Sequence, residues 1–403
     1  MGAEEAAVEA YVWGYPLVVM HRTRALLCSR IGSGRMNHRD HLATPADRAV
    51  VAPNNDTLYS SGWFDLRFGD LVIDVPPMDH PGRYWNVMIL DAYTHVAYAC
   101  RRLHGVNGTS VRVTLDPSTE PASGTLEVIP VATSTVWVLV RVLVDGPEDL
   151  PAARTLQRGI AVSAPPEHPN DLTERRGRPN EVHAAGAGFF EELRSCLAID
   201  PPGAWHPPLS DHARRIADGD HSLSDEQLAA AVAEGDRRLV EFGVGNDATG
   251  NGWGTRRSGA KFGHDVLARA AVAKFALAGH HPEENRAYFT SSDGTGAPLD
   301  GRRPVVLTFP VDREPPCDGF WSLTVYGQDM YLVDNEIDRW AIGDRTVGLR
   351  RDTTGLAITV GGPRPADIAN WLPAPAGPYL LALRVYEGRP GVVDASWFPP
   401  PLG

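Results

Sequence analysis

Residues Val136–Val144 have the sequence VWVLVRVLV, in which Arg141 is the one residue that is not apolar. A run of this kind favours a β-strand that is buried on both faces, because a strand with one face in water alternates apolar and polar side chains. A guanidinium buried in such a strand needs carboxylate or carbonyl partners. We therefore expect a central strand here. Arg141 would be either an internal clamp to Asp56, Asp65 or Asp91, or a group that binds a ligand.

The hydrophobic pattern changes three times outward from this strand. Residues 3–28 have the spacing of a helix, which Pro16 should kink or split. Residues 71–144 contain short apolar runs separated by turn-forming Gly, Pro and Asn. Helical periodicity follows, and strand patterns return from residue 302. The helical stretches are 148–162, 186–197, 224–242 and 261–278.

Local signals mark some ends of these helices. Ser224 and Gln227 have the spacing of a capping box, and Gly279 follows the last helical stretch as a C-terminal stop. Residues 243–254 are rich in Gly and Asn, which predicts a long loop.

This order of patterns predicts an α+β multidomain protein. We expect an N-terminal α+β domain at residues 1–146, a mainly helical segment at 147–284, and a jelly-roll-like C-terminal β-sandwich at 285–403. The run 320–326 alternates, so Trp321 should lie on the face opposite Ser322 and Tyr326.

Composition excludes several classes of protein. The 403 residues carry a formal net charge of −12, which argues against a nucleic-acid partner because phosphate binding needs a basic surface. No apolar run reaches the ~18 residues that span a bilayer. The N-terminus lacks the basic and apolar regions of a secretory signal. The four cysteines, Cys28, Cys100, Cys196 and Cys317, are far apart, which favours reduced thiols.

From these features we expect a cytoplasmic protein. Its partner would be a small-molecule substrate, with no nucleic acid and no membrane, and a homodimer is left open.

The chain lacks the common cofactor motifs. It contains no GxGxxG, GxxxxGK[ST], GxSxG or HExxH sequence. His38 and His41 form an HxxH pair, but they lie in a stretch rich in Arg and Asp that is typical of a solvated loop. We therefore expect neither a redox cofactor nor a metal.

The polar segment Pro53–Leu66 (PNNDTLYSSGWFDL) precedes the first strand patterns. Buried polar side chains need partners, so this segment either builds an elaborate turn or lines a polar pocket. In a pocket, Asp56 could act as a general base and Tyr59 as a hydroxyl donor.

A second group of candidates surrounds the strand pattern at 84–90. Arg83 and Asp91 share one face of it, but eight residues at ~3.3 Å each separate them by about 26 Å, so they cannot act on one bond. Asp91 and Tyr93, at the end of this strand, are better placed for the rim of a pocket.

Several motifs in order make the chain resemble proteins that carry the paired domains of unknown function DUF1254 and DUF1214. The first domain is indicated by residues 11–17 (YVWGYPL), 53–60 (PNNDTLYS), 82–85 (GRYW) and 90–94 (LDAYT). The second is indicated by residues 299–301 (LDG), 320–326 (FWSLTVY), 335–340 (NEIDRW), 370–375 (NWLPAP) and 383–386 (LRVY).

The resemblance implies an α+β first domain, a helical insertion and a jelly-roll-like C-terminal sandwich. It implies little about chemistry. The chain departs from the family at Val305 and Val306, where relatives tend to have tyrosine.

Our leading hypothesis is an enzyme of small-molecule metabolism that uses acid–base catalysis without a redox cofactor. A lyase, isomerase, cyclase or hydrolase would act on a polar or polyoxygenated substrate in an interdomain cleft. The alternative is a non-catalytic protein that binds carbohydrate or lipid. The candidate catalytic residues are Asp56, Tyr59, Asp91 and Tyr93. The candidate substrate-binding residues are Asn55, Arg83, Arg141, Trp321, Tyr326, Asn335 and Arg339.

Overall fold

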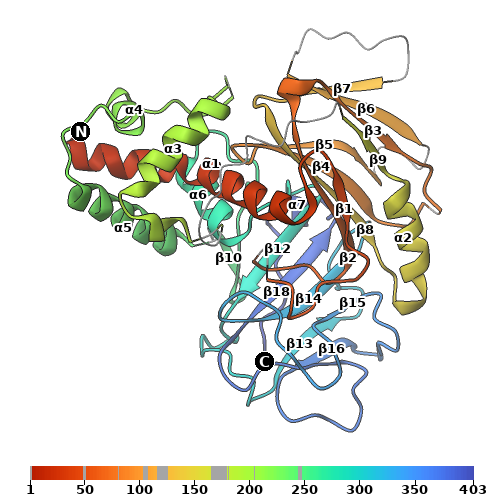
Figure 1. The fold of residues 1–403 in the computed structure, drawn as a ribbon. Coiled ribbons are helices and arrows are strands. Elements are labelled where there is room, and N and C mark those ends of the chain that lie inside the picture. The colour runs from red at the N-terminus through yellow and green to blue at the C-terminus, as the bar shows by residue number, and fades with distance from the viewer. Residues whose placement is uncertain are drawn as a thin grey trace.

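The predicted central strand is confirmed in the computed structural model (Figure 1). The structure describes residues 2–48, 51–79, 81–102, 108–115, 126–164, 179, 181–203, 205–243 and 247–403. Strand β8 (Thr135–Leu143) is the middle strand of a five-stranded sheet in the order β1-β2-β8-β4-β5. Its neighbours are β1 (Met36–His38), β2 (Thr57–Asp65), β4 (Trp85–Asp91) and β5 (Val96–Arg101). The paired strands among these are antiparallel.

Both faces of β8 are covered, which explains its continuous apolar sequence. Val136, Val138, Val140 and Val142 belong to a core shared with a second sheet and helix α2 (Leu150–Gly159). That sheet has the order β7-β6-β3-β9. Its strands are β3 (Leu71–Val75), β6 (Thr109–Thr114), β7 (Leu126–Pro130) and β9 (Ala161–Ser163).

The opposite face of β8 points toward the helices. Trp137 and Leu139 share a core with Met20 of helix α1 and Ala268 of helix α6. Helix α1 contacts α3, α4, α5 and α6, so it is part of the helical layer although its residues lie in the predicted first domain. These helices are α1 (Ala3–Ile31), α3 (Gly188–Ile199), α4 (Asp211–Asp218), α5 (Asp225–Phe242) and α6 (Val266–Phe275). Short 3-10 turns lie at η1 (Leu66–Phe68), η3 (Pro147–Asp149) and η5 (Val182–Ala185).

Helix ends agree only in part with the sequence predictions. The capping box of Ser224 and Gln227 is confirmed at the start of α5. Helix α1 continues through Pro16, so of the two predicted effects of this proline, a kink or a split, the split is wrong. Helix α6 ends at Phe275 with Ala276 as its C-cap, so Gly279 is not its stop. Part of the predicted loop at 243–254 forms the short strands β10 (Ala248–Gly250) and β11 (Trp253–Thr255).

The C-terminal unit has two sheets around one apolar core. Six strands follow the order β10-β11-β12-β18-β14-β15, and three follow β13-β16-β17. Their bounds are β12 (Asn285–Thr290), β13 (Val305–Pro310), β14 (Trp321–Gly327), β15 (Ala341–Gly343), β16 (Gly355–Val360), β17 (Trp371–Leu372) and β18 (Tyr379–Tyr386), followed by α7 (Pro390–Val393). The fold class is thus mixed α and β with several units. The jelly-roll connectivity stays a prediction.

The predicted alternation in β14 is confirmed. Trp321, Leu323 and Val325 point into the core between the two sheets. Ser322 and Tyr326 lie on the other face and bond to the first domain. The polar face of the larger sheet is therefore turned toward the N-terminal part of the chain (Figure 1).

Two further predictions concern the membrane and the thiols. Within the described ranges, no helix combines the length and the apolarity needed to cross a membrane. The side chains of Cys28 and Cys196 are buried and that of Cys317 is partly buried, and the side chain of Cys100 lies outside the described residues.

Close packing of α1 on α5 depends on Gly235. A Cβ at this position would lie 2.3 Å from Cδ1 of Tyr11. The Tyr11 ring is fully buried, and its hydroxyl donates to Asp236 at 3.1 Å, so it cannot move aside freely. We expect Gly235→Ala to lower the free energy of unfolding by about 1–3 kcal/mol, although alanine is the better helix former.

Chemical denaturation measures this effect. The control is Gly188→Ala in α3, where a new Cβ meets no atom within 4 Å and should leave stability unchanged or raise it. Equal effects of the two substitutions would contradict the packing argument.

Candidate functional site

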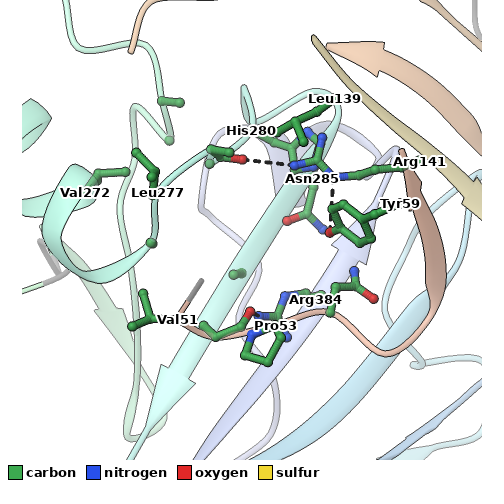
Figure 2. A pocket seen from close by; sticks show the side chains of 18 of the residues that line it. Val51, Pro53, Tyr59, Leu139, Arg141, Val272, Leu277, His280, Asn285 and Arg384 are labelled. Atoms are coloured by element: carbon green, nitrogen blue, oxygen red, sulfur yellow. Dashed lines mark hydrogen bonds between the residues drawn. The ribbon is translucent and has the colours of Figure 1, made fainter. Parts of the chain in front are cut away.

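A cavity of about 290 Å³ lies where the three parts of the chain meet. The central sheet forms one wall, strands β12 and β18 of the C-terminal unit form another, and α6 with the segment after it forms a third (Figure 2). Its polar lining residues include Asn54, Tyr59, Arg141, His280, Asn285, Arg384 and Tyr386.

Strand register sets a polar row on the central sheet. Arg141 of β8 is the direct cross-strand partner of Tyr59 in β2 and of Asn86 in β4. Its guanidinium donates from Nε to the Tyr59 hydroxyl at 3.2 Å and from Nη1 to Oδ1 of Asn86 at 3.4 Å. A third bond runs from Nη2 to the Ala278 carbonyl at 3.2 Å. Figure 2 shows Arg141 and Tyr59 side by side at the cavity.

A buried carboxylate fixes the orientation of Asn86. Glu284 is fully buried, and its Oε1 accepts from Nδ2 of Asn86 at 2.8 Å and from the Tyr84 hydroxyl at 2.6 Å. Because the amide nitrogen of Asn86 faces Glu284, its oxygen is left for Arg141.

The C-terminal unit contributes a second buried cation. Arg384 and Tyr386 are two residues apart on β18, so they share a face, and Asn285 of β12 is the direct partner of Tyr386. Arg384 donates from Nη2 to the Ala52 carbonyl at 3.1 Å and lies over the Tyr326 ring at 5.4 Å. The Tyr386 hydroxyl accepts a bond from Nδ2 of Asn54.

Arg141 and Arg384 are 3% and 7% exposed, yet neither has a carboxylate partner among the described residues. Two other lining arginines pair with carboxylates, Arg39 with Asp47 at 3.1 Å and Arg256 with Asp265 at 2.8 Å. A third, Arg286, is buried and donates to backbone carbonyls, among them those of Arg257 at 2.9 Å and Val393 at 2.6 Å. A buried cation without a counter-ion is costly, so the guanidiniums of Arg141 and Arg384 favour an anion in the cavity.

His280 presents a neutral ring to the same space. The Tyr98 hydroxyl accepts from the His281 backbone N–H at 3.3 Å and lies 3.0 Å from Nδ1 of His280, to which it is hydrogen-bonded. Burial and the charge of Arg141 hold the pKa of His280 well below its usual value. The ring is therefore neutral, with one nitrogen that donates and one that accepts.

The remaining lining is largely aliphatic. Val272 and Leu277 come from α6 and the residues after it, Leu139 from β8, and Leu27 from α1. Figure 2 places Val272 and Leu277 on the side away from Arg141 and Tyr59.

The polar groups are mainly hydrogen-bond donors. The guanidiniums of Arg141 and Arg384 and the Tyr59 hydroxyl can donate, whereas Asp47 is the one carboxylate among the described lining residues. Such a set can bind an anionic oxygen or stabilise negative charge that develops on one. In the described part of the chain, no group of three His, Cys, Asp or Glu residues is arranged to hold a metal ion.

Of the residues predicted for the site, Tyr59 and Arg141 line this cavity. The predicted carboxylate clamp of Arg141 is wrong, since its partners are Tyr59, Asn86 and the Ala278 carbonyl. The carboxylates proposed for it bond elsewhere. Asp56 bonds to Ser322 and Arg345, Asp65 to Arg67, and Asp91 to His206.

The two candidate bases lie at opposite ends of β8. The Asp56 carbonyl accepts from the backbone N–H of Val144, whereas Asp91 pairs with Val136. Eight strand residues at ~3.3 Å separate them by about 26 Å, so they do not form a catalytic pair. This distance rules out a glycosidase mechanism that uses both carboxylates.

The residues around Asp91 hold a turn and the helical layer. Its Oδ1 accepts from the backbone N–H of Tyr93 and His95, and its Oδ2 lies 3.0 Å from Nε2 of His206. The Tyr93 hydroxyl donates to the Asp200 carbonyl at 2.9 Å. Neither Asp91 nor Tyr93 is among the described residues of the cavity lining.

Arg83 is held away from the cavity. It is 3% exposed and bonds to Asp79 at 2.7 Å, to Asp149 at 2.6 Å and to the Leu143 carbonyl at 2.8 Å. These partners fix the start of β4 against the segment after β8.

The other predicted binding residues have partners within the fold. Trp321 lies in the C-terminal core. The Tyr326 hydroxyl donates to the Pro53 carbonyl at 2.7 Å. Asn335 organises its own loop, and Arg339 donates to the Trp371 carbonyl at 2.9 Å. Asn55 donates to the Ala43 carbonyl.

Sequence reasoning missed Arg384, Tyr386 and His280. Arg384 lies in the apolar run LALRVY at 381–386, which is the same signal that drew attention to Arg141. His280 follows the predicted helix at 261–278, where a cationic side chain is favoured, but α6 ends at Phe275 and the lowered pKa of His280 keeps its ring neutral.

Comparison with known families confirms the predicted pair of domains. Residues 33–164 match the family described as "Protein of unknown function (DUF1254)", and residues 284–390 match "Protein of unknown function (DUF1214)". The chain belongs to the proteins in which DUF1254 precedes DUF1214. The cavity lies between these two domains, since Arg141 belongs to the first and Arg384 to the second.

A solved structure shares the fold. The crystal structure of the VPA0106 protein from Vibrio parahaemolyticus aligns with a TM-score of 0.67 and 21% identity, covering 100% of this chain and 99% of that one. A putative uncharacterized protein from Burkholderia cenocepacia aligns with a TM-score of 0.46 and 11% identity, covering 96% and 91%. No curated protein matches the chain.

The position of Asp56 predicts a structural role that can be measured. Its Oδ2 accepts from the Ser322 hydroxyl at 2.6 Å and its Oδ1 lies 3.3 Å from Nη2 of Arg345, so it ties the two domains. We expect Asp56→Ala to lower the free energy of unfolding by about 1–3 kcal/mol, because it leaves buried partners unpaired. Denaturation of the full chain measures the loss, and Arg345→Gln should produce a similar one. Unchanged stability with lost activity would instead assign Asp56 to catalysis.

His281, next to the cavity residue His280, predicts that the stability of the fold depends on pH. Burial, with the charge of Lys261, lowers the pKa of His281 to about 4, from about 6.5 in an unfolded chain. Between these values the unfolded chain binds the proton more tightly, so stability falls as the pH drops from about 6.5 to 4. His281→Gln should reduce this fall, measured by urea denaturation across the window. The exposed His212→Gln serves as the control, and an equal effect of both variants would contradict the assignment.

Proposed function

We propose that the protein is an enzyme of small-molecule metabolism whose substrate binds in the cavity between the two domains. One observation carries the proposal. Arg141 and Arg384, from different domains, are both buried at this cavity without a carboxylate partner among the described residues. An oxygen anion of the substrate, or one that forms in the reaction, would supply the missing counter-charge.

The donors support acid–base chemistry that needs no redox cofactor. The Tyr59 oxygen already accepts the Nε–H of Arg141, so its own proton is available to a substrate. The same bond strengthens if the phenol oxygen becomes negative after it has donated. In this proposal Tyr59 moves the proton, and Arg141, Arg384 and His280 hold the developing charge.

Four reaction types share such an intermediate. A lyase, isomerase or cyclase that acts beside a carbonyl group would form an enolate, and a hydrolase of an ester or amide would form a tetrahedral oxyanion, so each would place negative charge on an oxygen. All four agree with an oxygen-bearing substrate. In this proposal the C-terminal unit is a jelly-roll-like sandwich that forms one wall of the site. The protein is proposed to act in the cytoplasm.

A non-catalytic binding protein is the second candidate. Stacking of sugars needs exposed aromatic rings, and within the described ranges the exposed large aromatic is Trp205, far along the chain from the C-terminal unit. The aliphatic lining formed by Leu27, Val272 and Leu277 favours a lipid-like ligand within this alternative.

Tyr59→Phe tests catalysis. It removes the proposed acid while keeping the ring, so we expect turnover to fall by about 10²–10⁴-fold with the fold intact. The full chain is incubated with a fractionated small-molecule extract, and mass spectrometry follows the depletion of one compound and the appearance of another.

Tyr288→Phe is the matched control, since this hydroxyl donates to the Trp397 carbonyl inside the C-terminal unit. It should leave turnover unchanged. An unchanged rate for Tyr59→Phe would overturn its role as the acid. Bound compounds that are never converted would favour the non-catalytic candidate.

A further inference from the structure

The cavity divides into a charged end and an aliphatic end. Arg141 and Tyr59 lie on the central sheet, and Arg384 lies near Pro53 on the C-terminal side (Figure 2). Val272 and Leu277 line the side that comes from α6. The lining therefore matches a molecule that is charged at one end and apolar along its body.

The aliphatic end argues against a ligand with hydroxyls all around it. Each buried hydroxyl needs its own hydrogen-bond partner, and Leu27, Val272 and Leu277 offer none through their side chains. The cavity of about 290 Å³ is also at the small end of ligand pockets, which hold roughly 300–1,000 Å³.

The charged end matches a carboxylate. Its two oxygens can accept from two guanidiniums at once, and Arg141 and Arg384 approach from different domains. Both cations influence the ring of His280, whose pKa each of them lowers, so they act on one region of the cavity.

We propose that the ligand is a small organic acid with an apolar body. Its carboxylate would lie between Arg141 and Arg384 and its hydrocarbon part against Leu139, Val272 and Leu277. This inference rests on the proposed function and narrows its substrate from a polar molecule in general to an amphipathic acid. Because the two cations come from different domains, the bound acid would also join the domains.

The test compares three probes on the full chain. Octanoate has the charge and the apolar body, 1-octanol has the body alone, and sorbitol is polyoxygenated and neutral. Binding is measured by calorimetry and by the shift in melting temperature. We expect octanoate to bind at least about tenfold more tightly than 1-octanol, and sorbitol not to bind.

Variants then locate the carboxylate. Arg141→Gln and Arg384→Gln should each lower the affinity for octanoate by about tenfold or more and leave the affinity for 1-octanol unchanged. Circular dichroism confirms that each variant is folded, and Arg384→Lys, which keeps the charge, should recover part of the affinity. The control is Arg350→Gln, because Arg350 is exposed and pairs with Asp367 outside the cavity. It should bind octanoate like the unaltered protein.

The outcomes separate this inference from the function it rests on. Equal affinity for octanoate and 1-octanol, or preferred binding of sorbitol, would overturn the proposal that the ligand is an organic acid. A turnover that depends on Tyr59 would still support the proposal that the protein is an enzyme. The proposal of an acidic ligand would also be overturned if Arg350→Gln weakened octanoate binding as much as Arg384→Gln does. Octanoate binding that depends on both cavity arginines would uphold the acid even if the turnover experiment failed.

Discussion

Strand β8 is apolar on both faces, so other parts of the chain must pack against both faces of its sheet. The arrangement of the other sheets and helices follows from this requirement. The even-numbered side chains of β8 pack against the second sheet and α2, and Trp137 and Leu139 pack against α1 and α6. Aliphatic helices cannot cover Arg141, because a guanidinium needs hydrogen-bond acceptors. The polar face of the C-terminal sheet approaches at this end instead, and the cavity lies where the covers meet (Figures 1 and 2).

The polar segment at 53–66 is mainly the contact surface for that C-terminal sheet. The Pro53 carbonyl accepts from Tyr326, Asn54 donates to Tyr386, and Asp56 bonds to Ser322. Pro53, Asn54, Tyr59 and Ser61 of this segment also line the cavity, and Tyr59 is the one that bonds to Arg141. The sequence predicted that this segment forms either a turn or a pocket lining. Several of its polar groups also form hydrogen bonds between the two domains.

Features that depend on local periodicity could be predicted. The central strand, the two faces of residues 320–326, the capping box at Ser224 and the order of the two domains all follow from patterns within short windows. The helical layer could not be predicted in the same way. Helix α1 packs against helices more than 150 residues away, and its own sequence does not indicate which helices these are. The candidate site was predicted only through Tyr59 and Arg141.

The sequence by itself determined which strand is buried on both faces, which family the chain belongs to, and that one charge lies inside an apolar strand. Only the tertiary structure decided what that charge meets. The pairing of Tyr59 and Asn86 with Arg141 depends on strand register across 82 and 55 residues, and Arg384 arrives from another domain. A side chain's type and spacing are local properties, but the partner of a buried charge is set by which surfaces pack together.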